Sequence, residues 1–111
     1  MGFQRACSIQ EFREGEAVAV QLDGIDVAVA RAGDDVYALQ DLCSHGHVAL
    51  SEGEVEKCAI ECWLHGSAFD LRSGKPLSPP ASEPVTTFPV EVRGDDVYVD
   101  VTTNLNGVTP S

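Results

Sequence analysis

Four residues in the middle of the chain have side chains that bind soft metals, and their spacing is regular. They form two short motifs, Cys43-Ser44-His45 and Cys62-Trp63-Leu64-His65, and sixteen residues separate His45 from Cys62. Each motif supplies one thiolate sulfur and one imidazole nitrogen, which suit zinc and iron–sulfur clusters. A glycine directly follows the histidine of each motif. The pattern therefore predicts one metal centre that is shared by two loops.

Two kinds of metal centre use two cysteines and two histidines. In a [2Fe–2S] cluster with mixed ligands, two thiolates bind one iron and two imidazoles bind the other, so each motif would reach both irons. A structural zinc ion takes the same four groups in a tetrahedron, but zinc fingers pair Cys with Cys and His with His in separate halves. The spacing therefore favours an iron–sulfur cluster with Cys43, His45, Cys62 and His65 as ligands. A zinc-stabilised interaction module is the alternative.

Other residues near the two motifs carry weaker signals. His47 is interpreted as a polar loop neighbour rather than as a further ligand. Cys58 and Cys7 are interpreted as buried free thiols that pack as small apolar groups. Cys58 falls within Val55–Ile60, which is predicted to be a strand. Trp63 either belongs to a docking face or packs beneath its loop, and the sequence leaves both interpretations open.

The rest of the chain has the pattern of a β-protein. Apolar runs rich in valine and alanine are separated by short turns with Gly and Asp, among them Asp23-Gly24, a strong signal for a two-residue hairpin. Ser8 and Glu11 match a capping box and predict a helix of one or two turns. The predicted strands cover residues 17–22, 25–31, 36–40, 88–93 and 97–101.

Residues 41–84 differ from this pattern. They contain few strand-length runs, several Gly and Pro residues, three of the four cysteines and all three histidines. A long irregular segment inside a compact domain is usually functional or disordered, and its apolar residues, such as Leu50, Ile60 and Phe69, argue against disorder. We therefore predict an all-β fold in which residues 41–84 form a functional segment. Residues 1–101 would form a single domain, and the polar residues 102–111 a flexible C-terminal tail.

The charge of the chain limits its partners. Eighteen acidic and seven basic residues give a formal net charge of −11, which disfavours nucleic acid and anionic lipid because binding to phosphate depends on Lys and Arg. The same charge either suits steering toward a basic protein surface or only keeps the protein soluble, and the charge alone leaves both interpretations open. The N-terminus lacks a signal-peptide pattern, and no apolar run approaches the roughly 20 residues that span a bilayer. We therefore expect a monomeric cytoplasmic protein, whose reduced cysteines are available to a metal.

Both motifs and the residues around them resemble the two boxes of the Rieske family of iron–sulfur proteins. The resemblance rests on DLCSH at 41–45, LSEG at 50–53, CWLHGSAFD at 62–70, GKP at 74–76 and SPP at 78–80. It is strongest toward the stand-alone ferredoxins that pass electrons to aromatic-ring dioxygenases. It implies the Rieske fold, an antiparallel β-sandwich with a smaller cluster-binding subdomain inserted at about residues 41–84. It also implies one [2Fe–2S] cluster bound by the four ligands above, and an electron carrier rather than an enzyme. The implied partners are a flavin-containing reductase and a terminal oxygenase; an accessory Rieske protein of iron–sulfur assembly or another redox pathway is the alternative.

Three positions differ from the respiratory and photosynthetic Rieske subunits. Those subunits have a disulfide where this chain has Val48 and Leu64, and a tyrosine hydroxyl near the cluster where it has Phe69. Ser67 matches a serine that donates to the cluster in those subunits. Fewer hydrogen bonds to the sulfur atoms lower the reduction potential, so the resemblance predicts a potential at the low end of the Rieske range, about −150 mV. Pro79-Pro80 matches the proline-rich loop that shields the cluster in the family.

Overall fold

The computed structural model describes residues 2–42, 49–63, 66–77 and 83–108 of the chain. In this part the regular structure consists of short antiparallel strands and two short 3-10 helices. No helix among these residues is long and apolar enough to cross a membrane. In chain order the elements are β1 (Gln4–Ser8), η1 (Ile9–Glu11), β2 (Ala17–Leu22), β3 (Ile25–Ala32), β4 (Asp35–Gln40), η2 (Leu50–Glu52), β5 (Val55–Glu56), β6 (Ala59–Glu61), β7 (Ala68–Asp70), β8 (Thr87–Phe88), β9 (Val90–Arg93) and β10 (Asp96–Val99).

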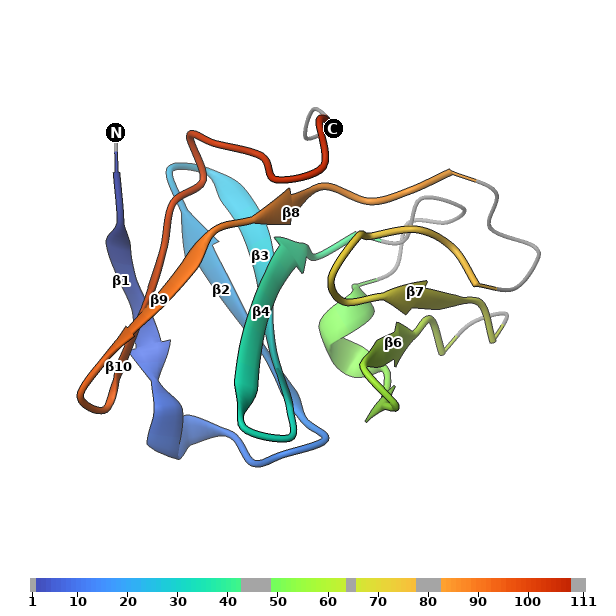
Figure 1. Ribbon diagram of the computed structural model, residues 1–111, viewed down its shortest axis with the longest axis horizontal. Helices are drawn as coiled ribbons and strands as arrows, with labels where there is room; N and C mark the ends of the chain where they lie inside the picture. The colour runs from blue at the N-terminus through green and yellow to red at the C-terminus, as the bar shows by residue number, and fades with distance from the viewer. Residues whose placement is uncertain (1, 43–48, 64–65, 78–82, 109–111) are drawn as a thin grey trace.

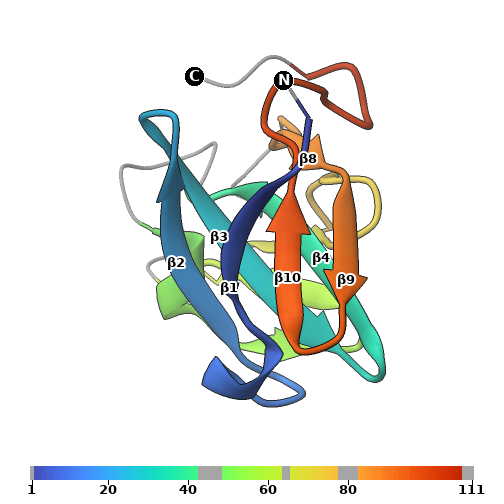
Figure 2. The same ribbon diagram turned by 90° about the vertical axis from the view of Figure 1, so that its left-hand side faces the viewer.

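The strands form three antiparallel sheets, which confirms the predicted all-β class. Their strand orders are β1-β10-β9, β2-β3-β4-β8 and β5-β6-β7. Figure 2 shows the first sheet in front of the second, so that the two form the layers of a sandwich. Figure 1 shows β6 and β7 beside this sandwich, in the part of the chain between β4 and β8. The third sheet therefore belongs to an insertion between β4 and β8, and the sequence of this insertion contains both predicted metal-binding motifs.

β3 is buried on both faces and joins two hydrophobic cores. Val27 and Val29 contribute to the core between the sandwich sheets. Ala28 and Ala30 point to the opposite side and contribute to a second core. A strand with one face in water would alternate buried and exposed residues, whereas these four are all buried. The other fully or nearly buried members of the second core are Leu39, Leu50, Val55, Ile60, Cys62, Phe69, Leu71 and Val85.

The predicted hairpin turns and strands of the sandwich are largely confirmed. Asp23 and Gly24 adopt φ values of 52° and 80°, the left-handed conformation that a tight two-residue turn requires. Ser8 and Glu11 form the predicted capping box at η1, which is a single 3-10 turn. The run predicted at 88–93 is divided at Pro89 into β8 and β9, which belong to different sheets. Proline has no N–H to donate to a strand neighbour, and this favours the break.

The single strand predicted for Val55–Ile60 is wrong. The chain reverses at Lys57 and Cys58, so that β5 pairs with β6. Both turn residues have left-handed φ values of 53° and 59°. Such turns are usually marked by Asn or Gly, and neither residue type is present at these two positions. The sequence therefore held no signal for this hairpin.

The C-terminal residues contact the point where the insertion ends. The N–H of Leu105 donates to the carbonyl oxygen of Thr87 at 2.8 Å. The Asn106 Nδ2 group donates to the carbonyl oxygens of Ser73 and Val85, at 2.8 and 2.7 Å. The flexibility that the sequence predicts for residues 102–111 stays a prediction, but residues 105 and 106 are hydrogen-bonded to the body of the domain.

Candidate metal centre

Among the four predicted ligands, Cys62 belongs to the described part of the chain. Cys43, His45 and His65 lie outside the described residues, and their positions relative to Cys62 stay a prediction. The described part accordingly contains no complete set of metal ligands. Five other residues discussed from the sequence also lie outside the described residues, namely His47, Val48, Leu64, Pro79 and Pro80.

Cys62 follows β6 and is held by the backbone of a closed loop. Its N–H donates to the carbonyl oxygen of Ser67 at 2.6 Å, and its carbonyl oxygen accepts from the N–H of Gly66 at 2.9 Å. Gly66 has a φ of 74°, which glycine adopts without steric cost. These bonds join the end of β6 to the start of β7. The loop of residues 62–67, which includes the predicted ligand His65 in its sequence, is therefore closed at its base.

The thiol of Cys62 lies on the inner side of this loop. Cys62 is 1% exposed and belongs to the second core, and its sulfur is not in a disulfide. Glu61 and Trp63, on either side of it, are exposed, as the alternation of an extended strand requires. Trp63 is 52% exposed, so it does not pack beneath the loop. Of the two interpretations left open by the sequence, the surface position is the one observed.

The loop that carries Cys43 and His45 in its sequence begins at Asp41, at the end of β4. Asp41 is buried, and its two carboxylate oxygens both accept from Ser51. Oδ1 accepts from the N–H of Ser51 and Oδ2 from its hydroxyl, each at 2.6 Å. The pair closes the base of residues 42–50. Sequence analysis did not single out either residue for a function, although both fall in stretches that carry the family resemblance.

The two loop bases meet through a glycine that follows η2. The backbone of Gly53 approaches the carbonyl group of Glu61 so closely that a Cβ atom at residue 53 would lie 1.6 Å from that oxygen. Gly53 has extended backbone angles that any residue adopts, so close contact, rather than conformation, requires glycine here. The N–H of Glu61 also donates to the carbonyl oxygen of Glu54 at 2.9 Å. η2 is therefore fixed against β6, one residue before Cys62.

The other two described cysteines are separate from this region or on its edge. Cys7 is buried in the sandwich core, on the opposite side of β3 from the core that contains Cys62. Burial raises the pKa of the Cys7 thiol to about 11, so it is a neutral thiol at pH 7. The interpretation of Cys7 as a structural residue is confirmed. Cys58 is half-buried, at the β5–β6 turn rather than within a strand.

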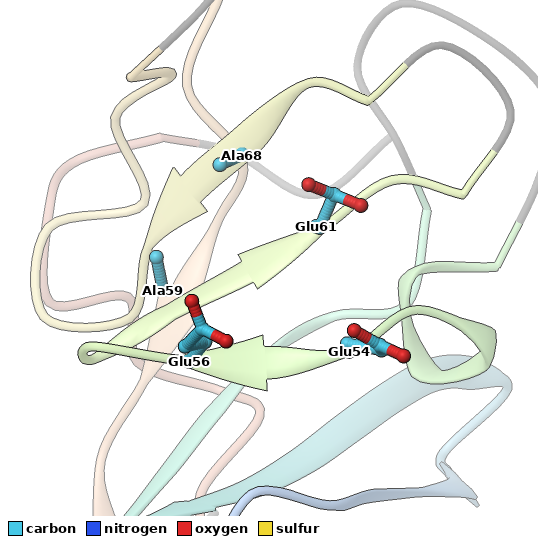
Figure 3. Close-up of a pocket in the computed structure, with 5 residues that line it drawn as sticks. All are labelled: Glu54, Glu56, Ala59, Glu61 and Ala68. Atoms are coloured by element: carbon cyan, nitrogen blue, oxygen red, sulfur yellow. The ribbon is translucent and has the colours of Figure 1, made fainter.

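The outer face of the β5–β6–β7 sheet is acidic. Figure 3 shows the carboxylates of Glu54, Glu56 and Glu61 around the small side chains of Ala59 and Ala68. Together they line a shallow hollow of about 170 Å³. Neither of the ion pairs found in the described part of the chain involves these three carboxylates. The face that borders the second loop therefore carries uncompensated negative charge.

The described residues fit a cluster held between the two loops. Cys62 offers a thiol that is in no disulfide, at the hydrogen-bonded base of its loop and within a core of apolar side chains. The bases of the two loops are in contact through Gly53 and Glu61. Each loop contains one Cys and one His of the predicted ligand set in its sequence, and a [2Fe–2S] cluster with mixed ligands needs two of each.

Comparison with known proteins agrees with this arrangement. The family model for the Rieske [2Fe–2S] domain matches residues 2–89. The ferredoxin subunit of 3-phenylpropionate/cinnamic acid dioxygenase from Shigella boydii serotype 4 (strain Sb227) is 41% identical over 97 residues, which are 86% of this chain and 91% of that protein. The match to ferredoxins with a [2Fe–2S] domain gives no support to the zinc alternative.

Two solved structures are similar over most of the chain. The ferredoxin of carbazole 1,9a-dioxygenase from Nocardioides aromaticivorans IC177 has a TM-score of 0.84 and 33% identity, and the match covers 100% of both chains. A chain in a complex of reduced oxygenase and oxidized ferredoxin in carbazole 1,9a-dioxygenase has a TM-score of 0.81 and 39% identity over 87% of this chain and 91% of that one. The chain therefore belongs to the Rieske [2Fe–2S] family, with a [2Fe–2S] cluster as its cofactor.

Proposed function

We propose that this protein is a one-electron carrier of a ring-hydroxylating dioxygenase system. It accepts electrons from a flavin-containing reductase and passes them to a terminal oxygenase. The observation that carries the proposal is the extent of the matches. The chain spans 91% of a dioxygenase ferredoxin subunit and 100% of a carbazole dioxygenase ferredoxin, but 29% of a terminal oxygenase chain from the same organism as that ferredoxin. The chain thus matches nearly the full length of a carrier protein, but less than a third of the length of a catalytic subunit.

The proposed cluster ligands are Cys43, His45, Cys62 and His65. When bound, the cluster takes up and releases single electrons without bond chemistry on a substrate. Cys62 supports this assignment, because its free thiol lies at a closed loop next to the predicted partner loop. The apolar side chains of Leu50, Ile60 and Phe69, all fully buried, keep water out of the core on the inner side of that loop.

The surface beside the second loop suits a basic partner protein. Trp63 is exposed and offers an aromatic contact of the kind enriched in interface cores. The acidic face with Glu54, Glu56 and Glu61 adds to a net charge of −11, which steers the chain toward positive surfaces. We expect this carrier to be a monomer. We also expect it in the cytoplasm, because thiolate ligands stay reduced there.

Reconstitution tests the proposed role. Purified reductase and oxygenase components of a ring-hydroxylating system are mixed with NADH and an aromatic substrate, with and without the holoprotein. We expect product formation to depend on the holoprotein and to be absent with Cys62→Ser, which removes a proposed ligand. If the holoprotein is reduced by the reductase but does not accelerate product formation with any oxygenase component, the dioxygenase role is wrong, and an accessory Rieske protein is favoured.

A further inference from the structure

We propose that Asp41 is a positioning residue for the cluster, because its contacts with Ser51 fix the first ligand loop relative to the second. The inference rests on the proposed ligand set, in which Cys43 lies two residues after Asp41. Asp41 itself is not proposed to touch the metal. Its effect would pass through the backbone of the two loops.

Asp41 is immobilised at the end of β4 by its own backbone. Its N–H donates to the carbonyl oxygen of Asp26 at 2.8 Å, and the next N–H, from Leu42, donates to Gln40 at 2.8 Å. The side chain is 7% exposed. Burying a carboxylate is unfavourable unless both oxygens are hydrogen-bonded. Ser51 supplies a donor to each oxygen, at distances typical of strong, charge-assisted bonds.

Ser51 links Asp41 to the base of the second loop through the contacts of η2. It lies in the single turn of η2, between the fully buried Leu50 and Gly53. The N–H of Gly53 donates to the carbonyl oxygen of Leu50 at 2.9 Å, and the backbone of Gly53 is pressed against the carbonyl group of Glu61. Figure 1 shows η2 between the sandwich and β6. A continuous path of contacts therefore runs from Asp41 through η2 to the residue before Cys62.

The consequence is that the bases of the two ligand loops are held next to each other. Nine residues, 42–50, connect the two ends that the Asp41–Ser51 pair joins. Groups that orient metal ligands from outside the coordination shell typically change metal affinity by about 10- to 100-fold when they are removed. Loss of the pair should therefore weaken iron retention and widen the spread of ligand geometries.

The chain offers a chemically matched control. At the end of the sandwich strand β10, Asp100 Oδ1 accepts from both the N–H and the hydroxyl of Thr102, at 2.9 and 2.5 Å. Both pairs use an N–H and a hydroxyl as donors and a carboxylate as acceptor. The Asp100 pair, however, is exposed, uses one carboxylate oxygen for both bonds, joins residues two apart and closes no ligand loop. Thr102→Ala therefore removes the same type of bond without the proposed positioning effect.

The test uses holoprotein variants and measures iron release to excess bathophenanthroline under reducing conditions. We expect Ser51→Ala to release iron roughly 10-fold faster than the wild type. Ser51→Thr, which keeps the hydroxyl, and Thr102→Ala should both release iron at nearly the wild-type rate. The EPR lines of the reduced Ser51→Ala protein should be broadened, which a general loss of stability does not produce. The proposal would be overturned if Ser51→Ala released iron at the wild-type rate and had the wild-type EPR line width. It would also be overturned if Thr102→Ala accelerated iron release as much as Ser51→Ala does.

Two further variants keep the result decisive. If Ser51→Ala yields no folded holoprotein, Asp41→Asn is measured instead, since it keeps the shape of the side chain and removes its charge. Charged hydrogen bonds are about twice as strong as neutral ones, so we expect several-fold faster iron release, and an unchanged rate would overturn the proposal. Cys62→Ser separates this inference from the ligand assignment. Retention of the full cluster by Cys62→Ser refutes the ligand set, whereas an inert Ser51→Ala beside an iron-free Cys62→Ser refutes only the positioning role.

Discussion

Substitution of Gly53 by alanine should be among the most damaging changes of a single methyl group in this chain. The added Cβ would lie 1.6 Å from the carbonyl oxygen of Glu61 and 2.8 Å from its carbon. Real Cβ atoms essentially never approach a heavy atom closer than 3.0 Å, so the backbones of η2 and β6 must separate by at least 3.0 − 1.6 = 1.4 Å. The atom that blocks the methyl group is backbone and cannot move aside as a flexible side chain would.

The expected loss of stability has two sources, the disturbed packing and a lost hydrogen bond. Overpacking of a rigid core costs about 1–3 kcal/mol. The hydrogen bond from the N–H of Glu61 to Glu54 lies at the same contact, and its loss adds about 1 kcal/mol. We therefore expect Gly53→Ala to lower the free energy of unfolding by about 3 kcal/mol. In a domain of this size, that corresponds to a fall of roughly 13 °C in the apparent Tm.

Gly33→Ala is the control for this experiment. Gly33 has a φ of 63°, and no heavy atom lies within 4 Å of the position its Cβ would take. The change therefore introduces backbone strain of about 1–2 kcal/mol without a steric clash. Thermal unfolding of both holoprotein variants is followed by circular dichroism at pH 7. If Gly53→Ala has an apparent Tm equal to or above that of Gly33→Ala, the argument from close backbone contact is refuted.

Three further predictions concern the cluster, the sandwich core and the acidic face. Phe69→Tyr should raise the reduction potential measured by voltammetry, because it introduces a hydroxyl donor into the core that contains Cys62; an unchanged or lower potential would contradict the expected role of this position. The pKa of Cys7 is raised from 9.0 to about 11 in the folded protein, so its unfolded form loses a proton first as the pH rises. Stability should therefore decrease from pH 9 toward pH 11, and the decrease should be smaller in Cys7→Ala, as measured by urea unfolding. Replacement of Glu54, Glu56 and Glu61 by glutamine should slow association with the oxygenase at low ionic strength and have little effect at high salt; equal rates at low salt, measured by stopped-flow electron transfer, would exclude this face from docking.

Local chemistry made much of the sandwich predictable. The Asp23-Gly24 turn needs two left-handed residues, and this dipeptide is among the few that supply them, so β2 and β3 could be placed from the sequence. The capping box at η1 is equally local, since Ser8 and Glu11 satisfy each other's backbone groups within one turn. Turns and caps that depend only on residues adjacent in the sequence could therefore be predicted.

The interior of the insertion was less predictable because contacts distant in sequence hold it together. Lys57 and Cys58 adopt left-handed angles that their types disfavour, and the pairing of β5 with β6 compensates for the strain. Gly53 is required by a carbonyl group eight residues away in the chain. The pair of Asp41 and Ser51 spans ten residues and has no periodic pattern. The ligand residues were conspicuous by type and spacing, whereas the residues that position them became visible only in the structure.

We propose that two imidazoles and two thiolates from the two loops bind the [2Fe–2S] cluster. Pulsed EPR of the reduced protein tests this ligand set, because nitrogen ligands couple to the unpaired electron and sulfur ligands do not. We expect couplings from two nitrogens in the wild type, and loss of one coupling in each of His45→Cys and His65→Cys. A cluster without nitrogen coupling, or a zinc-loaded protein without an EPR signal on reduction, would contradict it.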